Sequence, residues 1–233
     1  MSADEAIVLV GGLGTRLRGV VSDLPKPLAP VAGRPFLAWL LDHLAGTGVR
    51  RVILAAGYMA EKVQQAIGSQ WQSLQVDYSV ESQPLGTGGA LRQACTMLDG
   101  NAVHLLNGDT FLRYQPDAMA DAVHAAGGRI GMALAEVPDV SRYGAVHYRD
   151  GRVTGFCEKG LAGAGYINAG CYFLTEAALA ALPAEPQYSF EERVLGPASE
   201  AGSVCAYLAT SGFIDISVPD DYERAQSLFA GAR

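Results

Sequence analysis

The stretch Leu9–Leu17, which reads LVGGLGTRL, decides the fold together with the nearby segment Leu24–Leu28, LPKPL. The apolar run Ala6–Val10 has the length and the branched side chains of a buried strand, and it leads directly into three closely spaced glycines. Glycine lets backbone N–H groups turn toward one anion, and it has no side chain that would keep the anion away. A strand followed by such a loop predicts a phosphate site.

Two cations accompany these glycines. Arg16 presents a forked guanidinium, which suits phosphate oxygens better than a point charge does. Lys26 lies between Pro25 and Pro27, and the prolines fix φ and restrict the residues that precede them. The alternative is a glycine turn with two solvated basic residues. The spacing differs from both the P-loop and the dinucleotide-binding fingerprint.

Length and composition favour one globular domain. The chain has 233 residues, of which 49% are hydrophobic and 18% are charged, and α/β domains of this length commonly stay single. A net charge of −7 and a pI near 5.0 argue against a nucleic-acid partner, because binding a phosphate backbone needs a basic face. Positive charge for an anionic ligand must therefore be local.

Cysteines, histidines and targeting signals carry little functional information. The four cysteines and four histidines show no metal-ligand spacing, so we interpret the cysteines as small buried residues in a reducing compartment. The N-terminus does not resemble a signal peptide, and no apolar run approaches the roughly 18 residues of a membrane helix. We expect a cytoplasmic protein with no membrane partner.

Strands and helices alternate along the first half of the chain. Apolar patterning predicts strands at Ala6–Val10, Arg51–Ala55, Leu74–Val80, Ala102–Leu106 and Ile130–Val137, and helices at Pro35–Ala45, Ala60–Ile67, Thr87–Leu98 and Asp117–Ala126. This alternation predicts an α/β fold with a doubly wound, mostly parallel, Rossmann-like sheet. Ligands bind such sheets beyond the carboxyl ends of the strands, where the loops after Val10, Val80 and Leu106 lie.

The second half breaks this alternation. The patterns predict a hairpin over Gly144–Glu158, strands at Tyr166–Leu174 and Val204–Ala209, and helices at Glu176–Leu182, Phe190–Leu195 and Pro219–Phe229. We expect a β-rich lid on the sheet. An apolar helix face or the hairpin could form a homodimer contact.

Two aspartates are candidates for metal binding. Asp109 follows a buried strand and Gly108, although an aspartate at a strand end is more often a cap or turn residue. Asp215 lies among apolar residues, and a buried unpaired charge is expensive. One Mg²⁺ between the two carboxylates would remove both difficulties, since Mg²⁺ prefers carboxylates with substrate phosphates and water. Spacing alone does not establish this pairing.

The stretch Glu81–Leu91, ESQPLGTGGAL, leaves one strand and begins a helix. Its glycines would let the backbone approach a flat ligand closely, and the N–H groups at a helix start are free to bind polar edges. Glu81 could read a nucleobase, because its carboxylate matches the two adjacent donors of guanine but faces the carbonyls of uracil or thymine badly. A plain glycine-rich loop is the alternative.

Polar residues also follow the predicted hairpin. Glu158 could accept hydrogen bonds from sugar hydroxyls, while Lys159 could hold the phosphate of the sugar. A solvated surface pair is the alternative interpretation. Asn168 could contact a hydroxyl or could be a turn residue.

These motifs resemble those of the sugar-1-phosphate nucleotidylyltransferases over about Ala6–Tyr222, and most of all the short guanylyltransferases of D-glycero-α-D-manno-heptose 1-phosphate. The resemblance implies a nucleotide-binding half at about 1–137 and a half with the sugar-binding lid at about 138–233. The nucleotide-binding residues expected on this basis are Val10, Gly11, Gly12, Gly14, Thr15, Arg16, Lys26, Glu81, Gly86, Thr87 and Asp109. The expected sugar-phosphate-binding residues are Asn107, Gly144, Glu158, Lys159, Asn168 and Asp215. Ser217 stands where a glycine is more usual in the closing motif of the family.

The resemblance also implies a mechanism. A sugar-1-phosphate oxygen attacks the α-phosphorus of a nucleoside triphosphate, for which GTP is the expectation, and pyrophosphate leaves in line. Arg16, Lys26, Asp109 and Lys159 are the expected catalytic residues, and Mg²⁺ is the expected cofactor, bound by Asp109 and Asp215. A mannose-1-phosphate guanylyltransferase is the alternative substrate assignment. A glycosyltransferase and a non-catalytic regulatory homologue are the alternatives from other classes.

Overall fold

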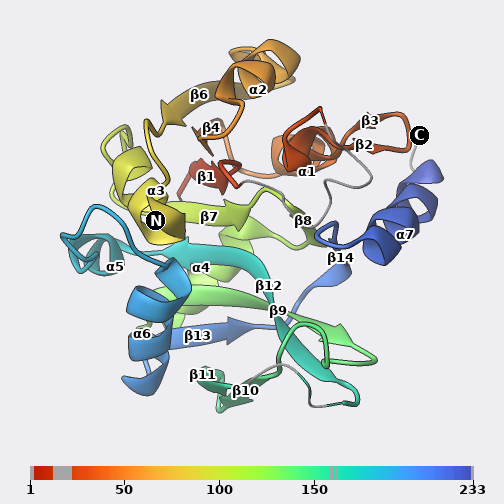
Figure 1. Cartoon of the computed structure of the whole chain (residues 1–233). Coiled ribbons are helices and arrows are strands. Elements are labelled where there is room, and N and C mark those ends of the chain that lie inside the picture. The colour runs from red at the N-terminus through yellow and green to blue at the C-terminus, as the bar shows by residue number, and fades with distance from the viewer. Residues whose placement is uncertain (1–2, 13–22, 158–159, 161, 232–233) are drawn as a thin grey trace.

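The computed structural model describes residues 3–12, 23–157, 160 and 162–231. Within these residues one ten-stranded sheet carries helices on both faces, and two small two-stranded sheets lie beside it (Figure 1). The strands are β1 (Glu5–Leu9), β2 (Pro30–Val31), β3 (Arg34–Pro35), β4 (Arg51–Ala56), β5 (Gln70–Trp71), β6 (Leu74–Val80), β7 (Val103–Asn107), β8 (Thr110–Arg113), β9 (Ile130–Val137), β10 (Val146–Arg149), β11 (Arg152–Phe156), β12 (Gly165–Leu174), β13 (Val204–Tyr207) and β14 (Ser211–Asp215). The helices are α1 (Phe36–Ala45), α2 (Ala60–Ile67), α3 (Gly86–Cys95), α4 (Pro116–Ala125), α5 (Glu176–Ala180), α6 (Gly196–Glu200) and α7 (Pro219–Ala230), with a 3-10 helix at Lys26–Leu28 and a π-helical turn at Glu191–Leu195.

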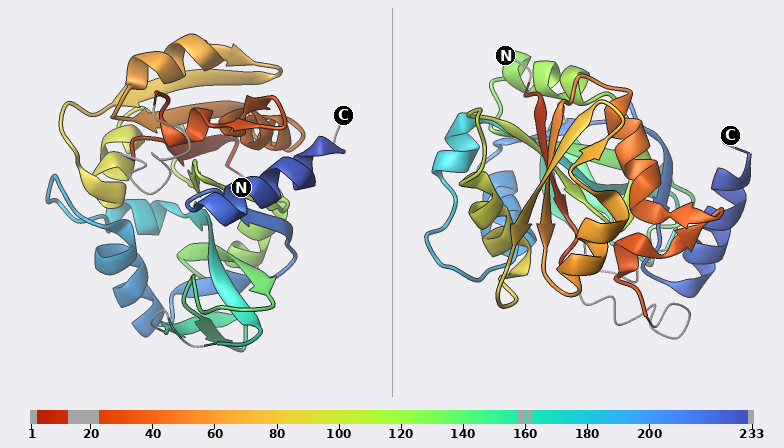
Figure 2. Two further views of the ribbon diagram at one scale, coloured as in Figure 1. Left: turned by 45° about the vertical axis from the view of Figure 1, so that its right-hand side comes forward. Right: turned by 90° about the horizontal axis from the view of Figure 1, so that it is seen from above.

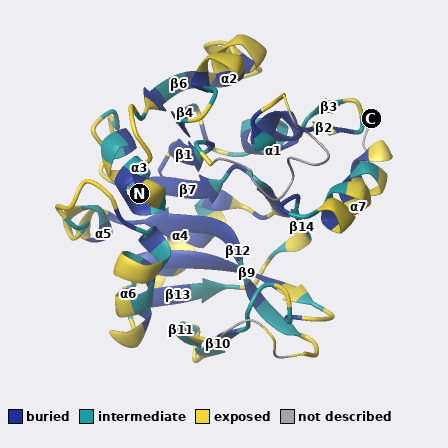
Figure 3. Ribbon diagram, in the orientation of Figure 1, coloured by how far each residue is buried: buried dark blue, intermediate teal, exposed yellow. Residues whose placement is uncertain are grey.

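The strands β7, β1, β4 and β6 lie side by side and run parallel. Successive side chains of β1 point to opposite faces: Ala6 and Val8 pack with α1, whereas Ile7 packs with α3. Both faces are therefore covered, and the central strands are almost entirely buried (Figure 3). This confirms the predicted doubly wound α/β fold, and it places the carboxyl ends of the four strands at one edge.

The strands of the second half continue the same sheet. β12 runs antiparallel to both β7 and β9, and β13 runs parallel to β9. The hairpin β10–β11 forms the far edge of the sheet (Figure 2). There β11 joins β13 through the pair Arg152 and Cys205. The predicted lid strands therefore extend the nucleotide-binding sheet without a break in the sheet.

The small sheet β8–β14 was not expected from the sequence. β8 begins directly after Asp109, and its antiparallel register with β14 pairs Thr110 with Asp215. The backbone N–H of Ile216 also donates to the carbonyl of Asp109 at 3.0 Å. This pairing brings the two aspartates together although they lie far apart in the sequence.

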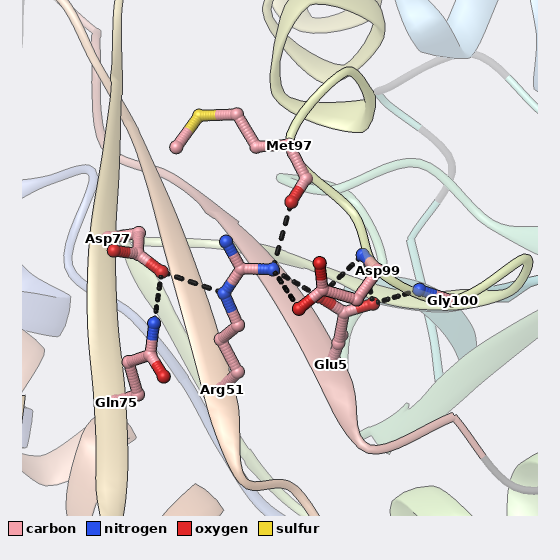
Figure 4. A network of polar contacts seen from close by, with 7 residues as sticks. All are labelled: Glu5, Arg51, Gln75, Asp77, Met97, Asp99 and Gly100. Atoms are coloured by element: carbon pink, nitrogen blue, oxygen red, sulfur yellow. Dashed lines mark hydrogen bonds and ion pairs between the residues drawn. The ribbon is translucent and has the colours of Figure 1, made fainter.

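A network of charged groups lies at the opposite edge of the parallel strands (Figure 4). The guanidinium of Arg51 contacts Glu5 at 2.8 Å, Asp77 at 2.7 Å and Asp99 at 3.0 Å. The Glu5 carboxylate, whose side chain is only 5% exposed, also accepts from the backbone N–H groups of Asp99 and Gly100. These contacts tie the amino-terminal ends of β1 and β4 to the middle of β6, and they satisfy a carboxylate that would be costly to bury alone.

One histidine of the core is a buried titratable group. His104 on β7 is fully buried, and its ring lies 5.1 Å from that of Phe173. Burial lowers the pKa of His104 to about 4. The ring is neutral in the folded protein at neutral pH.

Candidate functional site

A cavity of about 540 Å³ opens at the carboxyl ends of the parallel strands. It is lined by the strand ends, by the loops that follow them and by the first turn of α3. The lining residues are Leu9, Val10, Gly11, Gly12, Lys26, Pro27, Ala55, Gly57, Tyr58, Glu81, Ser82, Gln83, Pro84, Gly86, Thr87, Ala90, Asn107 and Asp109. The loops after β1, β6 and β7 therefore all contribute to one cavity, at the sheet edge where the sequence predicted them to lie.

Lys26 contributes a positioned ammonium to the cavity. It begins the 3-10 helix, where Pro27 and Leu28 are buried, and its side chain is only 9% exposed. Its Nζ atom lies 2.6 Å from Oδ2 of Asp109 and 2.6 Å from Oγ of Ser217. The lysine is therefore fixed at both contacts before any ligand binds.

Asp215 lies beside this group at the end of β14. Its Oδ1 atom accepts from the backbone N–H of Ser217 at 2.7 Å. Burial raises the pKa of Asp215, the nearby charge of Asp109 raises it further, and hydrogen bonds with Ser217 and the charge of Lys26 oppose the shift. Two carboxylates that repel each other in a partly buried position favour the binding of a cation between them.

Glu81 follows β6 and reaches the opposite part of the cavity. Its Oε2 atom accepts from the backbone N–H of Leu85 at 3.0 Å. Two glycines make room for Oε1, because a Cβ atom at Gly57 would lie 2.3 Å from it and a Cβ atom at Gly11 would lie 2.7 Å from it. The carboxylate is held in place, and each oxygen keeps a lone pair for a further donor.

The glycines at the start of α3 have a different packing partner from the one expected. A Cβ atom at Gly88 would lie 2.0 Å from the ring of Tyr188, and one at Gly89 would lie 2.2 Å from the carbonyl oxygen of Pro186. These two glycines admit a loop of the second half. Gly86 approaches the same loop, because a Cβ atom there would lie 2.6 Å from the carbonyl oxygen of Tyr188, and it also lines the cavity together with Thr87. The Thr87 hydroxyl contacts Glu191 at 2.7 Å and the N–H of Phe190 at 2.8 Å, which ties α3 to the same loop.

Asn168 and Gly144, which the sequence predicted as sugar contacts, do not line the cavity. The Asn168 amide donates to the Tyr172 hydroxyl at 2.7 Å and accepts from the N–H of Gly170 at 3.0 Å. Gly170, with φ of +70°, approaches Asn107 so closely that a Cβ atom would lie 2.8 Å from Nδ2. Asn107 lines the cavity, whereas Asn168 and Gly144 are not among its lining residues.

Several predicted site residues lie outside the described residues. They are Gly14, Thr15 and Arg16 of the first loop, and Glu158 and Lys159 after the hairpin. Their assigned roles stay predictions.

The family of the chain follows from its likeness to known proteins. Residues 5–230 match the family described as nucleotidyl transferase. The chain belongs to the nucleotidyl transferase family. An arrangement of one lysine and two aspartates beside a cavity at a sheet edge is consistent with the transfer of a phosphoryl-linked group.

Relatives of this nucleotidyl transferase match it over nearly its full length. The D-glycero-alpha-D-manno-heptose 1-phosphate guanylyltransferase of Aneurinibacillus thermoaerophilus is 38% identical over 95% of this chain and 96% of its own. The mannose-1-phosphate guanylyltransferase of Mycobacterium tuberculosis is 32% identical over 96% of this chain and 64% of its own. The crystal structure of HddC from Yersinia pseudotuberculosis complexed with GMP-PN is 34% identical, with a TM-score of 0.84 over 98% of this chain and 100% of that one.

Gly57 and Ser217 are among the residues near the site of this nucleotidyl transferase that sequence reasoning did not place there. Gly57 directly follows β4 at the same sheet edge as Glu81, and this position after a buried strand was the available signal. Ser217 contacts Lys26, which lies far from it in the sequence. Its position two residues after Asp215 was the available signal. Within the described residues no group of three or more histidine, cysteine or acidic side chains could hold a metal, and no helix is long and apolar enough to cross a membrane.

Proposed function

We propose that this nucleotidyl transferase is a guanylyltransferase that converts GTP and D-glycero-α-D-manno-heptose 1-phosphate into GDP-heptose and pyrophosphate. One observation carries the proposal: a single cavity is lined by Glu81, a carboxylate suited to guanine, and by Lys26 and Asp109, which are suited to phosphate and its cation. The relatives named for heptose 1-phosphate and for GMP-PN binding support both substrates.

The nucleobase assignment rests on Glu81. Guanine presents N1–H and its 2-amino group as adjacent donors, and a carboxylate can accept from both. The bond to Leu85 and the close approach of Gly57 fix the carboxylate in one orientation, so little side-chain freedom is lost when a base binds. Uracil and thymine would bring carbonyl oxygens against the same carboxylate.

The phosphate chemistry rests on the other end of the cavity. Both substrates are polyanions, so the protein lowers the barrier by reducing repulsion and by positioning the attacking oxygen in line with the leaving pyrophosphate. Lys26 supplies a positive charge between the two phosphate groups. Arg16 is proposed to stabilise the pyrophosphate, and Lys159 to hold the sugar phosphate. No covalent intermediate is required.

Asp109 and Asp215 are proposed to bind Mg²⁺. The donor set fits this ion, because Mg²⁺ is usually held by one or two carboxylates together with substrate phosphates. Burial raises the pKa of Asp215, the charge of Asp109 raises it further, and the charge of Lys26 offsets only part of this shift. When bound, Mg²⁺ would offset the negative charge of the phosphates.

The biological setting belongs to the same proposal. We propose a cytoplasmic location, because the four cysteines are free thiols, which suits a reducing compartment. The product would serve the synthesis of a surface polysaccharide. A homodimer contact is proposed at the hairpin, where Phe156 is 43% exposed. Mannose 1-phosphate is the alternative sugar substrate, favoured by the 32% identical relative from Mycobacterium tuberculosis.

Product analysis tests the proposal. The protein should convert GTP and the heptose 1-phosphate into GDP-heptose, identified by its mass after anion-exchange chromatography. Asp109→Asn is the control, and it should give no more product than a reaction without protein. Formation of GDP-mannose at a higher kcat/KM would select the alternative, and no nucleotide sugar from either phosphate would contradict the proposal.

A further inference from the structure

The Ser217 hydroxyl lies at the centre of the charged group beside the cavity. Ser217 is 6% exposed, and its Oγ atom lies 2.6 Å from Nζ of Lys26 and 3.5 Å from Oδ2 of Asp109. Its backbone N–H separately donates to Asp215 at 2.7 Å. Ser217 therefore contacts the lysine and both aspartates. Its hydroxyl contacts Lys26 and Asp109, whereas its backbone N–H contacts Asp215.

The contact between Ser217 and Lys26 matters because Lys26 also bonds Oδ2 of Asp109, a carboxylate of the proposed cation site. An ammonium has three donors and no acceptor, and within the described residues Lys26 uses Oδ2 of Asp109 and Oγ of Ser217. A cation bound by Asp109 would compete with the ammonium for this carboxylate. Lys26 is too buried for water to replace a lost partner freely, so the second acceptor decides where the ammonium stays.

We propose that Ser217 is a positioning residue for Lys26. Its hydroxyl accepts from the ammonium and keeps it at the phosphate end of the cavity when a divalent cation engages Asp109. The inference rests on the proposed function, since it assigns Lys26 to the substrate phosphates and Asp109 to the cation. It assigns to Ser217 a role that an alanine or glycine at this position could not fill, because both retain only the backbone N–H.

Removal of the hydroxyl tests this role in the full-length protein. In Ser217→Ala, engagement of Asp109 by a cation would leave the ammonium without a fixed protein partner. The dissociation constant for Mn²⁺, measured by electron paramagnetic resonance without substrates, should rise about tenfold, as expected for a hydrogen bond to a charged group. The kcat for pyrophosphate release should fall by a similar factor. Ser217→Thr should restore both values to within about threefold.

A double-mutant cycle separates positioning of Lys26 from a general effect on the fold. If Ser217 acts through Lys26, the change Ser217→Ala should alter the Mn²⁺ dissociation constant less than twofold in a Lys26→Met background. Ser199→Ala is the matched control, because this serine is also buried and, among the residues that the structure describes, its hydroxyl bonds the backbone of Leu195 alone, at 2.8 Å. It should leave Mn²⁺ binding and turnover unchanged.

The outcomes are distinguishable. Unchanged Mn²⁺ binding and turnover in Ser217→Ala, or equal losses in both backgrounds, would overturn the role of Ser217 while leaving the proposed reaction intact. Absence of Mn²⁺ binding in the wild type would overturn it as well. Failure of the wild-type protein to form any nucleotide sugar would instead contradict the proposed function.

Discussion

The substitution Gly57→Ala offers a test of base reading that leaves Glu81 itself in place. The added Cβ would lie 2.3 Å from Oε1, 2.9 Å from Cγ and 3.0 Å from Cδ of Glu81, and these are its three nearest atoms. Ordinary contact requires more than 3 Å, so the carboxylate must move by roughly 1 Å. Because no backbone atom is among these neighbours, the side chain can yield and the fold should be retained.

The expected loss follows from that displacement. Two hydrogen bonds from guanine to a carboxylate contribute about 1.5–3 kcal/mol each, and a misplacement of about 1 Å costs on the order of a hundredfold. We therefore expect kcat/KM for GTP to fall about a hundredfold, which corresponds to about 2.7 kcal/mol. The kcat/KM for ATP should change less than threefold, and the free energy of unfolding by less than about 1 kcal/mol.

The assay is pyrophosphate release at varied GTP and ATP with saturating heptose 1-phosphate. Glu81→Gln should give the same loss of GTP preference, because an amide replaces one acceptor by a donor. Gly155→Ala is the control, since a Cβ there meets no atom within 4 Å. An undiminished preference for GTP in both Gly57→Ala and Glu81→Gln would refute the base-reading role of Glu81.

Three further changes test other parts of the molecule. Asp109→Asn should lower kcat for pyrophosphate release at least a hundredfold, because it removes one charge of the carboxylate pair. Near-normal turnover would contradict its role. His104 takes up a proton near pH 6.5 when unfolded but only near pH 4 when folded, so as the pH falls through this window the unfolding free energy should drop by about 3 kcal/mol. His104→Phe should lack this part of the pH dependence in urea titrations, and an unchanged slope would exclude His104 as its source. Arg51→Met leaves Glu5 buried without its cation, so the free energy of unfolding in urea should fall by about 3 kcal/mol. The kcat should stay within twofold, and a loss of turnover without loss of stability would contradict this account.

The elements that local patterns specify could be predicted from the sequence. Apolar runs and glycine positions gave the order of strands and helices in the first half, and the topology rules then placed the loops after Val10, Val80 and Leu106, with Glu81 and Asp109, at one sheet edge. The first and last residues of helices and strands were predicted less accurately than their order. The helix predicted at Thr87–Leu98 spans Gly86–Cys95, and the strand predicted at Val204–Ala209 ends at Tyr207.

What remained hidden depends on contacts between distant segments. The pairing of β8 with β14, which joins Asp109 to Asp215, involves two short strands with an irregular register and no local signal. The contact of Ser217 with Lys26 likewise depends on packing of the whole chain. Gly88 and Gly89 illustrate a further difficulty. Glycine is required wherever another group approaches the backbone closely, so the sequence alone does not tell whether that group is a ligand or the 186–188 loop.

The central claim is that one cavity selects guanine and directs its triphosphate to a sugar 1-phosphate. The measurement that tests it most directly is kcat/KM for pyrophosphate release with Mg²⁺, over GTP, ATP, CTP, UTP and dTTP against heptose, mannose and glucose 1-phosphates. We expect the highest value for GTP with the heptose 1-phosphate, and values at least a hundredfold lower for the other nucleotides with the same sugar. A higher value for UTP or dTTP would contradict the assignment of Glu81, and no pyrophosphate release with any pair would contradict the account as a whole.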